Sequence, residues 1–280
     1  MRVRVLTMNV QNDDGGARRV AVINEEIRRS EPDLVALQEV LPPPSRAAAA
    51  ALLAETSLTV THQADVLNFA MPFEERYGGT AVATRWPHRF VELLDQRGEG
   101  ALDVPWCTLA VVVDIPDLGE LLFIATTMSW RLEAEATRER QALAVTDLDA
   151  RHRRALPSII AGDFNADPDA ASIRYLRGLQ SLQGRSVLYH DAWSIAHPGQ
   201  AGFTWDARNP RAAEEMHAIV RQPGHRRRLD YVFTGSWHAH PKARAEVVEA
   251  RLVLDQPVDG VWASDHFGLL VDLDITGGPD

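Results

Sequence analysis

Several strand-like segments of the sequence end on a polar residue where an apolar one would continue the pattern. The segment 159–165 reads Ile-Ile-Ala-Gly-Asp-Phe-Asn, so an apolar strand runs into Asp163 and, two residues later, Asn165. Two earlier strand patterns lead into Asn9 and Glu39. Carboxylates and carboxamides can activate water, hydrogen bond to anions and hold hard cations. Strand ends and their loops form the sites of layered α/β proteins, so we expect these side chains to form an active site.

Further polar residues of this kind occur toward the C-terminus. Asp230 lies just inside an expected strand, and Asp265-His266 directly precedes the last one. Each residue alone has a simpler interpretation: a helix cap for Asp163, a solvated position for Glu39, half of a surface ion pair for Asp230 and a surface turn for Asp265-His266. Together, and in this order along the chain, they indicate one site.

The elements that must position these residues alternate between strands and helices. Apolar periodicity predicts helices and strands in the proportions of an α/β protein. An α/β arrangement of two mixed sheets packed face to face, with helices outside, would accommodate these elements. No linker divides the chain, so residues 1–280 are interpreted as one domain. The expected strands are 2–8, 33–39, 80–85, 108–115, 120–127, 157–162, 229–234, 245–254 and 267–273, and the expected helices are 17–29 and 132–151, with a third near 169–178.

Composition narrows the function classes. The 280 residues carry a net charge of −10, which disfavours a broad nucleic-acid binder but leaves room for a local basic patch or a metal. No run of about 18 apolar residues occurs, so no membrane span is expected. The N-terminus reads as a strand and not as a signal peptide. The single cysteine, Cys107, forms no internal disulfide, which favours a cytoplasmic location.

Five sequence blocks resemble the endonuclease/exonuclease/phosphatase (deoxyribonuclease I-like) superfamily. They follow one another in the family's order and span nearly the whole chain. The resemblance implies a four-layer sandwich and a divalent-cation-dependent hydrolase of phosphoesters, that is, a phosphodiesterase, nuclease or phosphatase using Mg²⁺ or Mn²⁺. The blocks are TMNVQ (7–11), LQEV (37–40), IIAGDFNADP (159–168), RRLDYVF (227–233) and SDHFGLL (264–270).

The same resemblance implies a metal shell. Glu39 is the expected ligand, and Asn9 and Asp265 are expected in the same shell, directly or through water. Mg²⁺ takes oxygen ligands and keeps several waters, so one or two carboxylates suffice. Family members often carry an aspartate two residues after the first asparagine, and here that residue is the neutral Gln11.

Catalytic roles are implied for four further residues. Asp163 would orient or deprotonate the attacking water, and Asn165 would donate N–H groups to the phosphoryl oxygens. His266 would contact the phosphate as a cation or act as acid and base. Asp230 would hold its imidazole, as a buried carboxylate does in other His–Asp pairs.

One position departs from the family pattern. Met128 follows the strand at 120–127, where family members usually have a histidine. Methionine carries no charge and donates no strong hydrogen bond. Either Arg131, Trp130 or His62 contacts the substrate there, or the activity is detuned toward a binding module or diverted to a non-phosphate substrate. The other expected site residues are present, so we expect an active enzyme.

The substrate is less constrained by the sequence. Candidate contacts are Trp130, Arg131, Met128 and Arg228, which lies in the run His225-Arg226-Arg227-Arg228. Aromatic and arginine side chains serve nucleic acids and small phosphoesters alike. The sequence shows neither the lysine-rich arm that abasic-site enzymes of the family often carry nor the exposed apolar hairpin with which other members bind lipid surfaces. We therefore expect a monomer that acts on a small molecule or a nucleic acid, and favour a soluble phosphoester.

Overall fold

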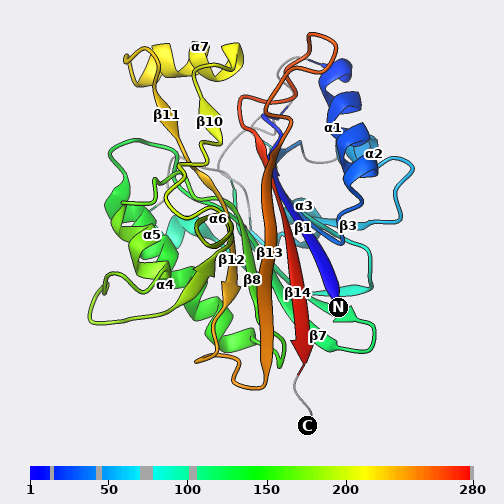
Figure 1. Ribbon diagram of the computed structural model, residues 1–280, viewed down its shortest axis with the longest axis vertical. Helices are drawn as coiled ribbons and strands as arrows, with labels where there is room; N and C mark the ends of the chain where they lie inside the picture. The colour runs from blue at the N-terminus through cyan, green and yellow to red at the C-terminus, as the bar shows by residue number, and fades with distance from the viewer. Residues whose placement is uncertain (13–15, 42–45, 70–77, 101–105, 278–280) are drawn as a thin grey trace.

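The structure is a computed structural model that describes residues 1–12, 16–41, 46–69, 78–100 and 106–277 (Figure 1). Its first sheet has six strands in the order β13-β14-β1-β2-β4-β3. β1 and β2 run parallel, and the other neighbours run antiparallel. The bounds are β1 Arg2–Asn9, β2 Leu34–Val40, β3 Thr59–His62, β4 Gly79–Thr84, β13 Ala243–Val253 and β14 Gly268–Gly277.

The second sheet also has six strands, in the order β5-β6-β7-β8-β12-β9. Here β7 and β8 run parallel, and the other neighbours run antiparallel. Both sheets are therefore mixed, as expected. The bounds are β5 His88–Leu94, β6 Thr108–Ile115, β7 Gly119–Thr127, β8 Ile159–Asp163, β9 Tyr189–Asp191 and β12 Asp230–Gly235.

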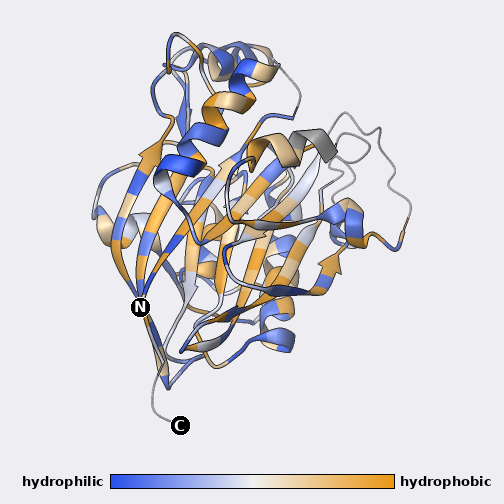
Figure 2. Ribbon diagram, turned by 90° about the vertical axis from the view of Figure 1, so that its right-hand side faces the viewer, coloured by the Kyte–Doolittle hydropathy of each residue, from blue (hydrophilic) through white to orange (hydrophobic). Residues whose placement is uncertain are grey.

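Helices cover the outer faces and complete the expected four layers. Apolar residues of both sheets meet in a central cluster that includes Val5 and Ala161. A second cluster packs the outer face of one sheet on α1 (Ala17–Ser30), and a third packs the other sheet on α4 (Glu135–His152). Figure 2 shows the strands largely apolar and the helices with hydrophilic stretches. The remaining short helices are α2 Arg46–Leu52, α3 Gln63–Val66, η2 Gln96–Glu99, α5 Ala171–Leu176 and α6 Ala192–Ala196.

A small unit stands at one end of the sandwich and was not expected from the sequence. It consists of β10 (Trp205–Asp206), α7 (Pro210–Ile219) and β11 (Arg226–Arg227), and we call residues 205–227 the cap (Figure 1). The two strands pair with each other and with neither main sheet. Trp205, Ala212, Met216 and Leu229 form a separate apolar cluster beneath α7.

The expected strands and helices are present, with ends shifted by a few residues. The short strands β3, β5 and β9 were missed. Cys107 is buried and has no disulfide. In the described part of the chain, no helix combines the length and the apolar composition that crossing a bilayer requires.

Candidate active site

The two-residue period of the strands aims three predicted residues into the space between the sheets. On β1, Val3 and Val5 face the central cluster, which places Asn9 on the same side. On β8, Ile159 and Ala161 face inward, so Asp163 does as well. Asp230 shares the inward face of β12 with Val232 and lies directly opposite Asp163 in the strand pairing.

Strand direction brings the remaining predicted groups to the same rim. β14 runs antiparallel to β1, with Thr7 opposite Leu269, so residues 264–266 lie beside the end of β1. The Ser264 hydroxyl donates to the Asn9 carbonyl at 2.7 Å and fixes this approach. His266 also forms a β-bridge with Trp205 of the cap. One sheet thus provides Asn9 and His266, and the other provides Asp163.

Glu39 reaches the site through a local irregularity. Val35 and Leu37 face the outer cluster, so a regular β2 would turn Glu39 outward as well. The pairing of β2 with β4 shifts register between Leu37 and Val40, and Glu39 has φ +61°. Such bulges and left-handed residues redirect a side chain. Gly78 permits this geometry, because a Cβ there would lie 2.5 Å from the Glu39 carbonyl carbon.

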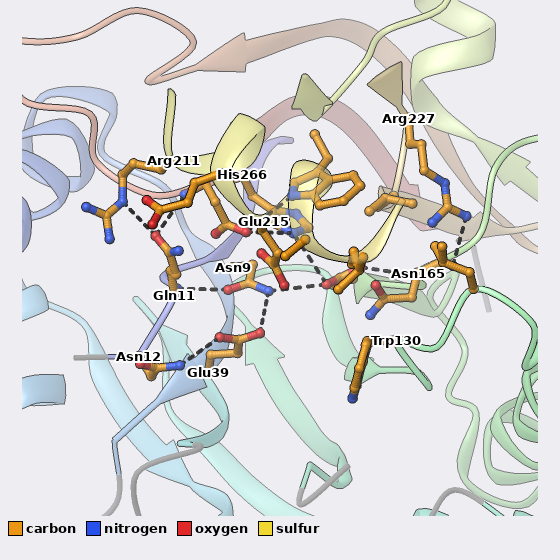
Figure 3. Close-up of a pocket in the computed structure, with 18 of the residues that line it drawn as sticks. Asn9, Gln11, Asn12, Glu39, Trp130, Asn165, Arg211, Glu215, Arg227 and His266 are labelled. Atoms are coloured by element: carbon orange, nitrogen blue, oxygen red, sulfur yellow. Dashed lines mark hydrogen bonds and ion pairs between the residues drawn. The ribbon is translucent and has the colours of Figure 1, made fainter. Parts of the chain in front are cut away.

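Hydrogen bonds connect Glu39, Asn9 and Asp163 into one network, and Figure 3 labels its Glu39 and Asn9 members. The Asn9 amide donates to Glu39 Oε1 at 3.0 Å and to Asp163 Oδ2 at 3.2 Å. Asn12 donates to Glu39 Oε2 at 3.1 Å, and the Gln11 N–H donates to Asn9 Oδ1 at 2.9 Å. Asn9 therefore has a fixed amide orientation between the two carboxylates.

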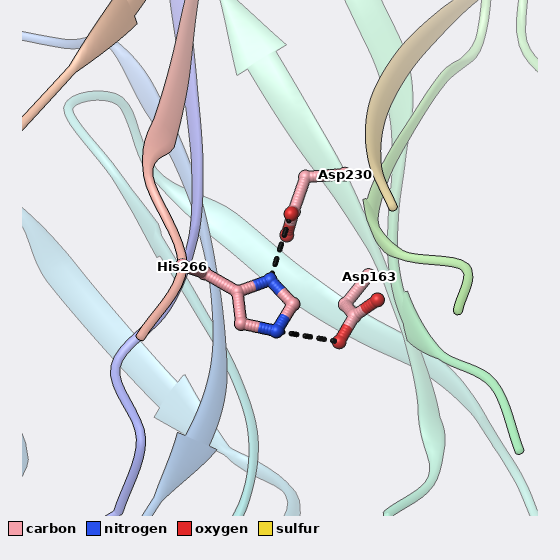
Figure 4. Close-up of side chains that lie close together, drawn as sticks. All are labelled: Asp163, Asp230 and His266. Atoms are coloured by element: carbon pink, nitrogen blue, oxygen red, sulfur yellow. Dashed lines mark hydrogen bonds and ion pairs between the residues drawn. The ribbon is translucent and has the colours of Figure 1, made fainter. Parts of the chain in front are cut away.

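His266 lies between two aspartates (Figure 4). Its Nδ1 donates to Asp230 Oδ2 at 2.9 Å, while its Nε2 lies 4.0 Å from Asp163 Oδ2 and 3.8 Å from Asp265 Oδ2. Burial opposes the imidazolium, but the charges of Asp230, Asp265 and Asp163 outweigh it and raise the pKa of His266 well above its usual value. The site therefore contains a buried histidine cation with Nε2 directed at Asp163.

Burial and charge crowding raise the pKa of the carboxyl groups. The pKa of Glu39 rises to about 7, mainly by burial and then by the charge of Asp265, while the Asn9 hydrogen bond works in the other direction. Burial also raises the pKa of Asp163 to about 7; His266 opposes this rise and Asp230 adds to it. At neutral pH these groups can exchange protons, as a general base must.

Asn165 is held beside Asp163 by a backbone turn. It has φ +51°, and its N–H donates to Asp163 Oδ1 at 2.9 Å. One N–H of its side-chain amide donates to the Met128 carbonyl at 3.1 Å, and an asparagine amide has a second N–H to offer. Asn165 lines the same cavity as Asp163 and His266.

The donor set suits a hard divalent cation on the Glu39 side of the site. Glu39, Asp163, Asp265 and Asn9 line one cavity with carboxylate and amide oxygens. Burial, and after it the charges of neighbouring carboxylates, raises the pKa values of Glu39 and Asp163, and a cation beside them would favour their ionised forms. Asp163, Asp230 and His266 also have ligand atoms within 4.8 Å of one another, but His266 Nδ1 already donates to Asp230.

These residues line a cavity of about 670 Å³ beneath the cap. The sequence did not indicate several of its lining residues, above all Glu215 of α7. Although the residue is exposed on one side, burial of its carboxyl group toward the cavity, and then the charge of Asp265 and a hydrogen bond with it, raises the pKa of Glu215 to about 8. The cap also adds Arg211 and Arg227; the Nε of each donates at 2.7 Å, to Gln11 and to Asp167 respectively.

Three of the predicted substrate contacts lie outside the described cavity lining, whereas Trp130 is part of it. Arg228 is buried in a bidentate pair with Asp191, at 2.9 and 2.8 Å, because it points opposite to Arg227. The Met128 side chain is buried in the outer cluster beside α4, and only its backbone carbonyl serves the site. Arg131 is exposed near Glu133.

His62, the other group considered for the Met128 position, is also placed elsewhere. Its Nε2 donates to the Val40 carbonyl at 2.9 Å, and its Nδ1 accepts from Ala64 at the start of α3. It is therefore a buried helix cap, and it is not among the described cavity residues.

Solved structures of the same architecture are similar over nearly the whole chain. D. rerio TDP2 complexed with single strand DNA product is 19% identical, covers 98% of this chain and 99% of its own, and has a TM-score of 0.69. The human Nocturnin catalytic domain with bound sulfate anion is 21% identical, covers 98% of this chain and 94% of its own, and has a TM-score of 0.68. A Bacteroides vulgatus endonuclease/exonuclease/phosphatase is 17% identical, covers 99% of this chain and 100% of its own, and has a TM-score of 0.68. At these identities the likeness establishes the fold. Curated protein sequences gave no significant match.

A family model gives the remaining evidence. The model of the Endonuclease/Exonuclease/phosphatase family matches residues 6–266, from the end of β1 to the histidine of the site. This range includes every residue placed in the site above. The chain therefore belongs to the Endonuclease/Exonuclease/phosphatase family.

Proposed function

We propose that this protein is a divalent-cation-dependent hydrolase of phosphoesters. The observation that carries the proposal is the placement of His266. It is held by Asp230 and directed at Asp163, in the same cavity as the Asn9–Glu39 pair. Family membership supports the same general reaction. The printed names of two similar structures, one with a single strand DNA product and one with sulfate, keep nucleic acid among the substrates to test.

In the proposed mechanism, Glu39 would hold Mg²⁺ or Mn²⁺ together with Asn9 and Asp265, directly or through water. The cation, when bound, neutralises charge on the phosphoryl group. Asp163 orients a water molecule and takes its proton as the water oxygen attacks phosphorus. Asn165 donates its second amide N–H to a phosphoryl oxygen, where negative charge grows in the transition state.

His266 completes the reaction on the leaving side. As the bond between phosphorus and the ester oxygen breaks, His266 Nε2 gives its proton to that oxygen. Asp230 keeps the imidazolium in place through Nδ1 at 2.9 Å and stabilises its charge. The raised pKa of His266 favours this protonated starting state.

The test is a panel of phosphodiesters, phosphomonoesters and oligonucleotides, each assayed with Mg²⁺, with Mn²⁺ and with a chelator. We expect turnover of at least one class, its loss with the chelator, and a decrease of roughly 10²-fold or more for Asp163→Asn and for His266→Asn. Asp169→Asn is the matched control, because Asp169 is exposed only six residues after Asp163. An enzyme that is inert on the whole panel with either cation contradicts the proposal.

A non-catalytic binding module is the alternative raised by Met128. It predicts cation or ligand binding by calorimetry without turnover in the same panel. The burial of the Met128 side chain in the core favours the enzyme, because the substitution leaves the groups in the cavity intact.

A further inference from the structure

The cavity that contains the hydrolytic groups also has an extensive apolar lining. Trp130 and Leu132 follow β7 and keep 37% and 38% of their surface exposed. Figure 3 shows Trp130 beside Asn165, on the cavity side. Large apolar side chains left exposed together in a cavity indicate a binding surface. The apolar lining residues are Trp106, Trp130, Leu132, Ala218, Ile219 and Leu229.

Ala218 and Ile219 belong to the cap, so both sides of the cavity contribute apolar atoms. At about 670 Å³, the cavity lies within the roughly 300–1,000 Å³ of small-ligand sites. It therefore has room for a group larger than the phosphate itself.

The charges of the lining disfavour a chain of phosphates. Among the described lining residues, the carboxylic acids are Glu39, Asp163, Glu214, Glu215 and Asp265, and the cations are Arg211, Arg227 and His266. Both arginines already donate to other residues, Arg211 to Gln11 and Arg227 to Asp167 and the Asn165 carbonyl. A cation beside Glu39 would serve one phosphate, and further phosphates would meet carboxylates.

We infer that the substrate is an ester of a single phosphate that carries an aromatic or other apolar group, and that this group packs on Trp130. The inference rests on the proposed function and specifies its substrate class. Trp130 is then the residue that determines specificity, because it offers an aromatic face next to the reacting phosphate. Leu132, Ala218 and Ile219 complete the apolar surface around it.

A series of p-nitrophenyl phosphodiesters tests this inference. The leaving group stays constant, and the second substituent is methyl, phenyl or 1-naphthyl. Burial of one ring against the apolar lining should raise kcat/KM roughly tenfold from methyl to phenyl. Trp130→Ala should bring the phenyl-to-methyl ratio of kcat/KM close to one. Trp237→Ala is the control, since Trp237 is 65% exposed outside the described cavity lining and should keep the ratio.

The outcomes separate the two proposals. Equal kcat/KM for the methyl and phenyl esters, together with unchanged kcat/KM of both esters in Trp130→Ala, refutes the apolar subsite and leaves the hydrolase intact; a loss for both esters in Trp130→Ala would mean that the p-nitrophenyl ring occupies it. A single-stranded oligonucleotide cleaved with a higher kcat/KM than the naphthyl ester refutes it as well. No turnover of these esters combined with turnover of another class in the panel refutes the apolar subsite alone, and inactivity on the whole panel with either cation refutes the proposed function itself.

Discussion

Replacing Glu39 by glutamine should change how stability depends on pH. Glu39 has a pKa of about 7 in the folded protein, against an ordinary value of 4.5. Between these values the folded state binds more protons than the unfolded state, so the free energy of unfolding falls as pH rises. Below pH 4.5 the ionisation of Glu39 does not lower the free energy of unfolding, and above pH 7 it lowers it by its full amount. The difference of about 2.5 pH units corresponds to about 3 kcal/mol.

This magnitude is an upper bound, because the Glu39 side chain keeps some contact with solvent. The variant also loses one hydrogen-bond acceptor toward Asn9 or Asn12, and the Asn9 bond is already included in the pKa of Glu39, where it opposes the rise. Removing the charge relieves Asp163, whose own pKa Glu39 helps to keep high through their shared negative charge, so this secondary effect has the same sign.

Urea denaturation in a chelator, from pH 4.5 to pH 8, measures the effect. We expect the free energy of unfolding of Glu39→Gln, relative to the wild type, to increase with pH by up to about 3 kcal/mol. Groups with unchanged pKa values in the two proteins cancel in this difference. Adding Mg²⁺ at pH 8 to about 1,000 times its Kd should then reverse the order, because a ligand at that concentration stabilises the wild type by about 4.1 kcal/mol.

A difference between the two proteins that stays constant over this pH range would show that Glu39 is an ordinary solvated carboxylate. The crowded carboxylate site would then be wrong, whatever the enzyme assays show. Equal stabilisation of both proteins by Mg²⁺ would separately exclude Glu39 as a ligand.

Three further substitutions test the structure around the site. Gly162→Ala should cost roughly 2–3 kcal/mol in urea denaturation and reduce turnover, because its Cβ would lie 1.9 Å from the Thr126 carbonyl oxygen and displace the neighbouring aspartate; unchanged stability would show that the two strands are farther apart. Met128→His should lower the melting temperature without raising phosphodiesterase activity, since the side chain is buried in the core; a gain in activity would mean that it reaches the substrate. Arg228→Leu should cost about 3 kcal/mol by removing the bidentate partner of the buried Asp191, which keeps the Ser194 hydrogen bonds and a 3.7 Å contact with Arg177, while kcat of the folded enzyme stays near the wild-type value; a selective rise in KM or fall in kcat would return Arg228 to the site.

Period-two patterning explains why much of the site could be predicted. The inward direction of Asn9, Asp163 and Asp230 follows from apolar residues on the same face of their strands, which are Val3 and Val5 for Asn9, Ile159 and Ala161 for Asp163, and Val232 for Asp230. Glu39 is different, since the same pattern points it outward and only the bulge and positive φ turn it back. A backbone irregularity of this kind has no apolar signature, and only the family resemblance indicated Glu39.

The cap shows where sequence reasoning was insufficient. The segment has a helix signal, with Asn209 as N-cap before Pro210 and apolar residues at Ala212 and Met216. Its acidic face reads as solvated, so nothing local indicated that Glu215 would overhang the site. The prediction that Arg228 contacts the substrate was wrong for a related reason. Adjacent residues of an extended segment point in opposite directions, so Arg227 reaches the cavity and Arg228 pairs with Asp191 instead.

The separate apolar cluster beneath α7 has an evolutionary consequence. The groups proposed to activate water come from the two sheets, whereas Ala218 and Ile219 come from a helix that rests on its own small core. Asn209 anchors this helix by donating to the carbonyls of Ser264 and Asp265. Residues 210–224 can therefore diversify, or be exchanged in the laboratory, while the hydrolytic groups stay in register. Substrate selectivity can therefore change through mutations in the cap, while the hydrolytic groups on the two sheets stay the same.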